Sequence, residues 1–187
     1  MRADRLNAFT DAVIAIALTL IVLEIPVPSA GPGGAPKHVL VMFGAYGLAF
    51  VNIVIFWNNL HQMMRDIRII DARVLWANNA LLFGITLNPF VFRWFGDVGM
   101  TAQPVAAYGV VMVLCTTAYT LLERAIVAAD PDSPVKQAIG AGAKEFFSGG
   151  LYVAGIALAF VSPWISAVAY VIVAAMWFVP DRRFKQP

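Results

Sequence analysis

The chain has 187 residues, of which 60% are hydrophobic and only 13% are charged, and its mean hydropathy is +0.76. Soluble domains carry about 25% charged residues and about 45–50% apolar ones, so this composition predicts an integral membrane protein. The formal net charge of +2 is too small to favour nucleic acid as a partner. With Cys115 as its one cysteine, the sequence offers neither a disulfide framework nor a thiolate metal site.

The first thirty residues hold an apolar run between Asp11 and Glu24. This run, about 17–19 residues long, exceeds the roughly 7–15 residues of a signal-peptide core, and we expect a retained transmembrane helix. Asp4 and Asp11 are also untypical of a signal peptide. A carboxylate such as Asp11, one turn inside the hydrocarbon, is costly there and usually faces protein or water.

Six segments are long and apolar enough to be candidate spans, since a membrane helix needs about 20 residues, with a range of roughly 17–25. They cover residues 7–25, 39–61, 74–92, 105–126, 146–161 and 164–179. Asn88-Pro89 should kink the third segment or end it early. Ser133 is suited to cap a helix whose first residue is Pro134, so a helix should restart there before the fifth segment. The sequence predicts an all-α membrane protein with one domain, residues 1–187.

The basic residues are distributed asymmetrically between the predicted loops. If the N-terminus is inside, the outer loops receive only Lys37 and Arg93, and the inner side receives the other eleven of the thirteen. These eleven are Arg2, Arg5, Arg65, Arg68, Arg73, Arg124, Lys136, Lys144, Arg182, Arg183 and Lys185. Positively charged loops stay in the cytoplasm, so we expect both termini to be cytoplasmic and the chain to lie in the cell (inner) membrane.

Enzymatic motifs are missing from the sequence. The two histidines, His38 and His61, fall in a loop and at a helix end, and no zinc motif, nucleophile elbow, phosphate-binding loop or CxxC pair is present. We expect no enzyme, no metal site and no cofactor.

Transport and conduction are harder to separate. A proton-coupled transporter usually carries ionisable residues near the middle of the membrane, and the second, fifth and sixth segments lack them there. A small-solute or cation/proton transporter remains the alternative to a channel. A non-conducting membrane scaffold is the third possibility.

A channel needs a helix face that surrounds the ions and a narrow point that can open or dewet. Ile16, Leu20 and Leu23 recur at helical spacing with Thr19 beside them, and they form such a face on the first helix. Asp11 lies about 140° around the helix from Ile16, so it should face a neighbouring helix instead. Spacing alone leaves open that the apolar residues simply pack or face lipid.

The second and third segments hold an unusual number of polar side chains. In membranes such groups commonly form hydrogen bonds between helices, worth roughly 0.6–2 kcal/mol each. We expect this role for most of them, and Trp57, His61, Arg5 and Asp11 could form one buried network at the inner side. The polar set comprises Asn52, Asn58, Asn59, His61, Asn78, Asn79, Thr86 and Asn88.

Arg5-x-x-x-Phe9-Thr10-Asp11, followed by the apolar run, resembles the RxxxFSD signature of the transmembrane-protein-175 family of potassium channels. Phe56-Trp57 with His61, and the segment from Leu75 to Phe90, resemble the second and third helices of that family. The resemblance covers the first half of the chain, and a single six-helix repeat is the prokaryotic form. Two positions depart from the pattern. Thr10 replaces the serine, and the family histidine position is Leu60, with His61 one residue later.

The resemblance implies a homotetramer that conducts K⁺ in the lipid bilayer, with the first helix lining the pore. It puts the narrow constriction at Ile16, further apolar layers at Leu20 and Leu23, and a residue linked to potassium preference at Thr19. It implies that Arg5, Phe9, Thr10 and Asp11, with Trp57, His61 and Asn78, hold the helix in place. The sequence has no TVGYG carbonyl filter, so selectivity would come from side chains and pore width. Glu24 at the outer mouth would either concentrate cations or simply extend to the interface.

Overall fold

The computed structural model describes residues 3–25, 36–65, 67–139 and 143–178, and within them the chain forms helices and short connections, with no strand. The predicted all-α class is confirmed. The helices are α1 (Ala3–Leu23), α2 (Pro36–Arg65), α3 (Ala72–Thr86), α4 (Asn88–Val98), α5 (Ala102–Ala129), α6 (Pro134–Ile139), α7 (Ala143–Ala159) and α8 (Pro163–Phe178).

Four helical segments of the described chain are long and apolar enough to cross a membrane. They are α1, α2, the segment that α3 and α4 form together, and α5. The third segment runs on to Val98, beyond the predicted end at residue 92. Helices α7 and α8 have 17 and 16 residues. At 1.5 Å per residue they are about 24–26 Å long, slightly less than the roughly 30 Å of a hydrocarbon core.

The predicted break at Asn88-Pro89 is confirmed. Helix α3 ends at Thr86, and α4 begins at Asn88 with the proline in its first turn, where a missing N–H costs nothing. The Asn88 side-chain amide donates to the Ile85 carbonyl over 2.9 Å, so it satisfies one of the carbonyl groups at the end of α3. The bend therefore leaves few backbone groups unpaired.

The predicted cap at Ser133 is also confirmed, because the Val135 N–H donates to the Ser133 hydroxyl oxygen over 3.3 Å. The helix that starts here is the short α6, which ends at Ile139, and α7 begins at Ala143.

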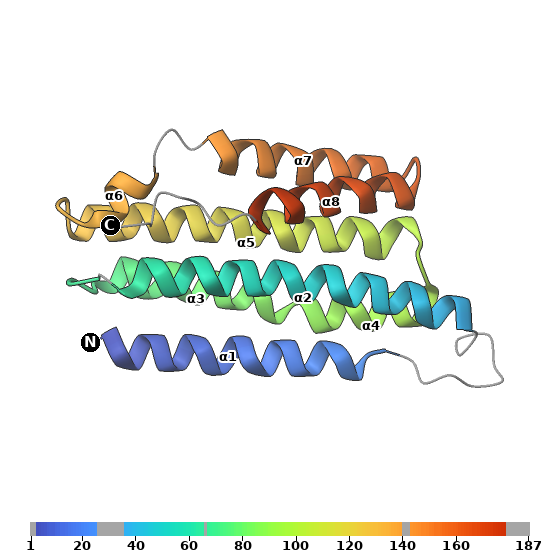
Figure 1. Ribbon diagram of the computed structural model, residues 1–187, viewed down its shortest axis with the longest axis horizontal. Coiled ribbons are helices and arrows are strands. Elements are labelled where there is room, and N and C mark those ends of the chain that lie inside the picture. The colour runs from blue at the N-terminus through green and yellow to red at the C-terminus, as the bar shows by residue number, and fades with distance from the viewer. Residues whose placement is uncertain (1–2, 26–35, 66, 140–142, 179–187) are drawn as a thin grey trace.

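The helices lie side by side in a bundle in which α5 occupies the centre (Figure 1). Helix α5 packs against α3 on one side and α7 on the other, whereas α1 lies at the edge and contacts α2, α3 and α4. Helices α3 and α5 approach closely because Gly84 has no side chain. A Cβ atom there would lie 2.8 Å from the sulfur of Cys115. Cys115 is fully buried and serves as a small apolar core residue.

Several predictions fall on residues outside the described ranges. These are the end of the sixth predicted segment at Val179 and the basic residues Arg2, Arg182, Arg183 and Lys185.

Candidate pore helix and its neighbours

Helix α1 has one packed face and one uncovered face in the single chain. The packed face repeats every three to four residues and is at most 4% exposed. It consists of Leu6, Thr10, Ile14, Ala17 and Ile21. On the other side of the helix Ile16, Leu20 and Leu23 are 59%, 45% and 75% exposed, and Thr19 between them is exposed as well. The four residues predicted to face a pore thus form one uncovered stripe, which we call the α1 stripe.

Thr19 is the polar member of the α1 stripe. Its hydroxyl donates to the Ile16 carbonyl over 2.8 Å, a bond within the same helix. Because this bond uses the hydroxyl hydrogen, the Thr19 oxygen presents its remaining electron pairs to the outside. An oxygen in this state accepts hydrogen bonds or coordinates a cation.

In the N-terminal half of α1, Asp11 contacts the neighbouring helix α2. The Trp57 indole N–H donates to the Asp11 carboxylate over 2.8 Å, and the Trp57 ring stacks on the His61 ring with centroids 5.6 Å apart. Trp57 and His61 are four residues apart, one helical turn, so the one-residue shift of the histidine still leaves the two rings adjacent.

The single chain thus brings Asp11, Trp57 and His61 of the predicted network together, but all three are exposed in it, as are Arg5 and Phe9. The Asp11–Trp57–His61 contacts lie on the surface because no other part of the described chain covers this end of α1 and α2.

Asn78 fastens α1 to α3. Its amide donates to the Thr10 hydroxyl oxygen over 3.0 Å, and the Thr10 hydroxyl lies 3.4 Å from the Asn78 carbonyl oxygen. Both side chains are buried, so each supplies the partner that the other needs in an apolar surrounding. The replacement of the signature serine by Thr10 keeps the hydroxyl that makes this contact.

At the far end of α1, Glu24 lies just past the last helical residue and approaches Arg93 of α4. Their charged groups are 3.8 Å apart, and Arg93 also lies 3.8 Å from Asp97. Sequence reasoning weighed a pore-mouth role and extension to the interface, and it missed this ion pair. Arg93 could have indicated this pair, since it is one of the two basic residues predicted for the same side of the membrane as Glu24.

Asn52 holds three helices together, which the sequence predicted only in part. Its amide donates to the Tyr108 hydroxyl oxygen of α5 over 2.9 Å, and the Tyr152 hydroxyl of α7 donates to its carbonyl oxygen over 3.2 Å. The asparagine was expected to bond between helices, but its tyrosine partners were not identified. By contrast, Thr86 donates to the Phe83 carbonyl within α3, and Asn88 of α4 donates to the Ile85 carbonyl only three residues earlier in the chain.

No group of three or more His, Cys, Asp or Glu side chains within the described ranges is placed to hold a metal ion.

The long apolar helices define an all-α integral membrane protein. Residues 5–89 match the family model described as "Endosomal/lysosomal potassium channel TMEM175". A protein named potassium channel from Chryseobacterium sp. is 37% identical over 187 residues, covering 100% of this chain and 97% of the relative. The chain therefore belongs to the TMEM175 family, and the resemblance noted in the sequence is confirmed.

Two further relatives agree. A potassium channel of Chamaesiphon minutus is 29% identical, and the match covers 93% of this chain and 92% of that protein. The crystal structure described as that of a lysosomal potassium-selective channel TMEM175 homolog from the same organism superimposes with a TM-score of 0.78 at 25% identity. That match covers 95% of this chain and 96% of the other. The likeness thus extends over the second half of the chain, where the sequence motifs gave no signal.

Proposed function

We propose that this chain is a subunit of a potassium channel in which four copies surround a common axis and each turns its α1 stripe toward that axis. The proposal rests on the relatives, which are named potassium channels, and on one observation of this chain. That observation is the uncovered α1 stripe, which no other part of the described subunit covers and which combines apolar side chains with the Thr19 hydroxyl at the positions that the family resemblance gives to the pore. Closed rotational symmetry brings the same face of each copy together.

Rings of Ile16, Leu20 and Leu23 would make a narrow apolar passage. Such a passage excludes water when it is tight and conducts when it widens, so it acts as gate and sieve together. Ile16 is proposed as the narrowest point. Ions then move down their gradient, without a chemical step and without coupling to a second solute.

The preference for K⁺ is assigned to pore width and to the Thr19 hydroxyl, whose oxygen is free to accept. Glu24, repeated by symmetry, would attract cations at the outer mouth, although the Arg93 guanidinium 3.8 Å away offsets part of its charge. Both groups are near the surface, where salt screens their effect.

For the topology we propose six spans with both termini in the cytoplasm, with α7 and α8 as the two short spans. The asymmetric distribution of Lys and Arg supports this orientation. A bend at Asn88 would let α3 and α4 serve as one span, since together they cover Ala72–Val98.

The test is a reversal potential measured on purified protein in liposomes under a K⁺/Na⁺ gradient. Ile16→Asn should hydrate the constriction, so we expect a larger conductance and a reversal potential closer to zero. The matched control is Val22→Asn, since Val22 is 41% exposed on the same helix but lies about 120° around it from Ile16. The control should conduct like wild type.

If Ile16→Asn shows the same K⁺ current and the same Na⁺ current as wild type, the pore assignment is wrong. Saturating flux coupled to a second ion would favour the transporter alternative, and the absence of any flux would favour a scaffold.

A further inference from the structure

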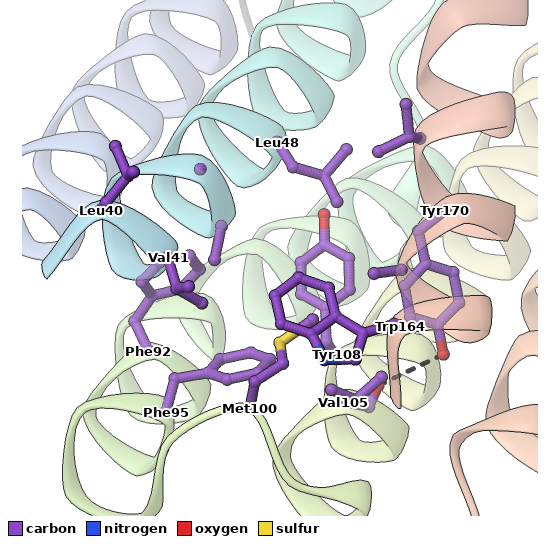
Figure 2. Close-up of a pocket in the computed structure, with 14 residues that line it drawn as sticks. Leu40, Val41, Leu48, Phe92, Phe95, Met100, Val105, Tyr108, Trp164 and Tyr170 are labelled. Carbon is purple, nitrogen blue, oxygen red and sulfur yellow. Dashed lines mark hydrogen bonds between the residues drawn. The ribbon is translucent and has the colours of Figure 1, made fainter. Parts of the chain in front are cut away.

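A cavity of about 380 Å³ opens between α2, α4, α5 and α8, and it contains no residue of the α1 stripe. Its wall includes Leu40, Val41 and Leu48 of α2, Phe92 of α4, Tyr108 of α5 and Trp164 of α8 (Figure 2). Sites that hold small molecules measure roughly 300–1,000 Å³, so this cavity is large enough to bind one.

The cavity exists because α2 carries two small residues, Gly44 and Ala45, between its larger ones. A Cβ atom added at Gly44 would meet no atom within 4 Å, so this position faces open space and not a neighbouring helix. From Leu40 to Leu48 the wall extends for eight residues, about 12 Å along the helix axis. The space is therefore elongated parallel to the helices.

The two tyrosine hydroxyls of the wall are already engaged. The Tyr108 hydroxyl oxygen accepts from Asn52, and the Tyr170 hydroxyl donates to the Val105 carbonyl over 3.2 Å. The remaining named wall residues are apolar or aromatic. An apolar space of this kind does not hold water well, and an empty one forfeits the dispersion contacts of its lining, so the chemistry of the wall selects a hydrocarbon chain.

The position of the cavity indicates where the headgroup of such a lipid would lie. It lies at the end of the bundle where α2, α5 and α8 begin (Figure 1). Lys37 is exposed in the first turn of α2 and precedes Leu40 and Val41 by three and four residues, so it lies on the same helix face just above the cavity. Trp164, 59% exposed in the first turn of α8, has the amphipathic ring that favours the level of the lipid headgroups.

We propose that this cavity binds one acyl chain of an anionic phospholipid, and that the Lys37 ammonium group binds the phosphate of the same lipid. The chain enters along α2 from the membrane interface, and Gly44 provides the room for it. The site is separate from the α1 stripe, so the lipid is a bound component of the subunit and not a pore blocker.

Native mass spectrometry of the purified full-length protein tests this site. Dioleoylphosphatidylglycerol and dioleoylphosphatidylcholine are titrated separately, because they share acyl chains and differ in headgroup charge. Wild type should bind one phosphatidylglycerol per subunit in preference to phosphatidylcholine, by about fivefold, the effect expected of one basic residue near an anionic headgroup. Gly44→Leu should fill the cavity and abolish this bound lipid.

The matched control is Gly47→Leu, on the same helix. A Cβ atom at Gly47 also meets nothing within 4 Å, but Gly47 does not line the cavity. It should bind phosphatidylglycerol like wild type. Unchanged binding by Gly44→Leu, or an equal loss in Gly47→Leu, would overturn the assignment of the site.

Lys37→Gln is a second test of the site. It does not disturb the packing of the helices, because the Lys37 side chain is exposed. It should lower phosphatidylglycerol binding to the level of phosphatidylcholine, and an unchanged preference would refute the role of Lys37. Potassium flux in liposomes should persist in Gly44→Leu. A lack of flux in wild type would instead count against the proposed function and leave the lipid measurement standing.

Discussion

Replacing Asn52 by Leu tests whether one buried amide holds the centre of the bundle together. Asn52 links α2 to α5 through Tyr108 and to α7 through Tyr152, and it is 4% exposed. Leucine has a similar size but neither donates nor accepts. The substitution therefore removes both links between helices and leaves two buried tyrosine hydroxyls short of a partner.

The magnitude follows from these two bonds. Hydrogen bonds between membrane helices contribute about 0.6 kcal/mol on average and up to about 1.7 kcal/mol, so losing two should cost roughly 1–3 kcal/mol of unfolding free energy. The upper half of the range is favoured, because the Tyr152 hydroxyl is buried and loses its acceptor altogether. Tyr152→Phe removes one bond only and should cost about half as much.

The assay is equilibrium unfolding in mixed micelles, followed by circular dichroism. Asn58→Leu is the control, since Asn58 is exposed six residues further along α2 and should tolerate leucine with a small change. In the double variant Asn52→Leu/Tyr152→Phe both partners of one bond are gone, so the combined loss should be smaller than the sum of the single losses. Strict additivity, or equal losses for Asn52→Leu and Asn58→Leu, would refute the reasoning.

Two further predictions concern other contacts of the bundle. Asp11→Ala removes the acceptor of the Trp57 indole and should lower the yield of assembled protein, measured by size-exclusion chromatography with light scattering; a full yield of stable assembly would contradict its structural role. Gly155→Ala places a methyl group against the Tyr170 ring and should cost about 1–3 kcal/mol of unfolding free energy, whereas Gly150→Ala enters open space and should be neutral or stabilising in the same unfolding assay.

Local signals in the sequence predicted the break before Pro89 and the start of α6 correctly, whereas the ends of most other segments differ by two to six residues. Pro89 cannot continue α3 and Ser133 caps α6, and each effect depends on the residue itself and its nearest neighbours along the chain. For the same reason the spacing of its residues in the sequence predicted the α1 stripe. Helical periodicity gathers Ile16, Leu20 and Leu23 on one side whatever surrounds them.

Contacts between distant residues were less accessible. Tyr108 and Tyr152 lie within apolar runs, and nothing in their spacing shows that their hydroxyls meet Asn52, 56 and 100 residues away. The ion pair of Glu24 and Arg93 was missed for the same reason, since it forms only because the fold places α4 beside the end of α1. The cavity between α2, α4, α5 and α8 was also missed, because a glycine in a membrane helix indicates close packing as often as open space.

Burial in one subunit divides the candidate site residues of α1 into two groups. Thr10 is buried against Asn78, so its contribution is complete within the single chain. Ile16 and Thr19 have the opposite property, since no residue of the described subunit covers them. Asp11 and Trp57 share this exposure while already bonded to each other, which suits a contact that neighbouring copies cover. An assembly that places the α1 stripe on its axis and the Asp11–Trp57 pair between subunits accounts for both surfaces at once.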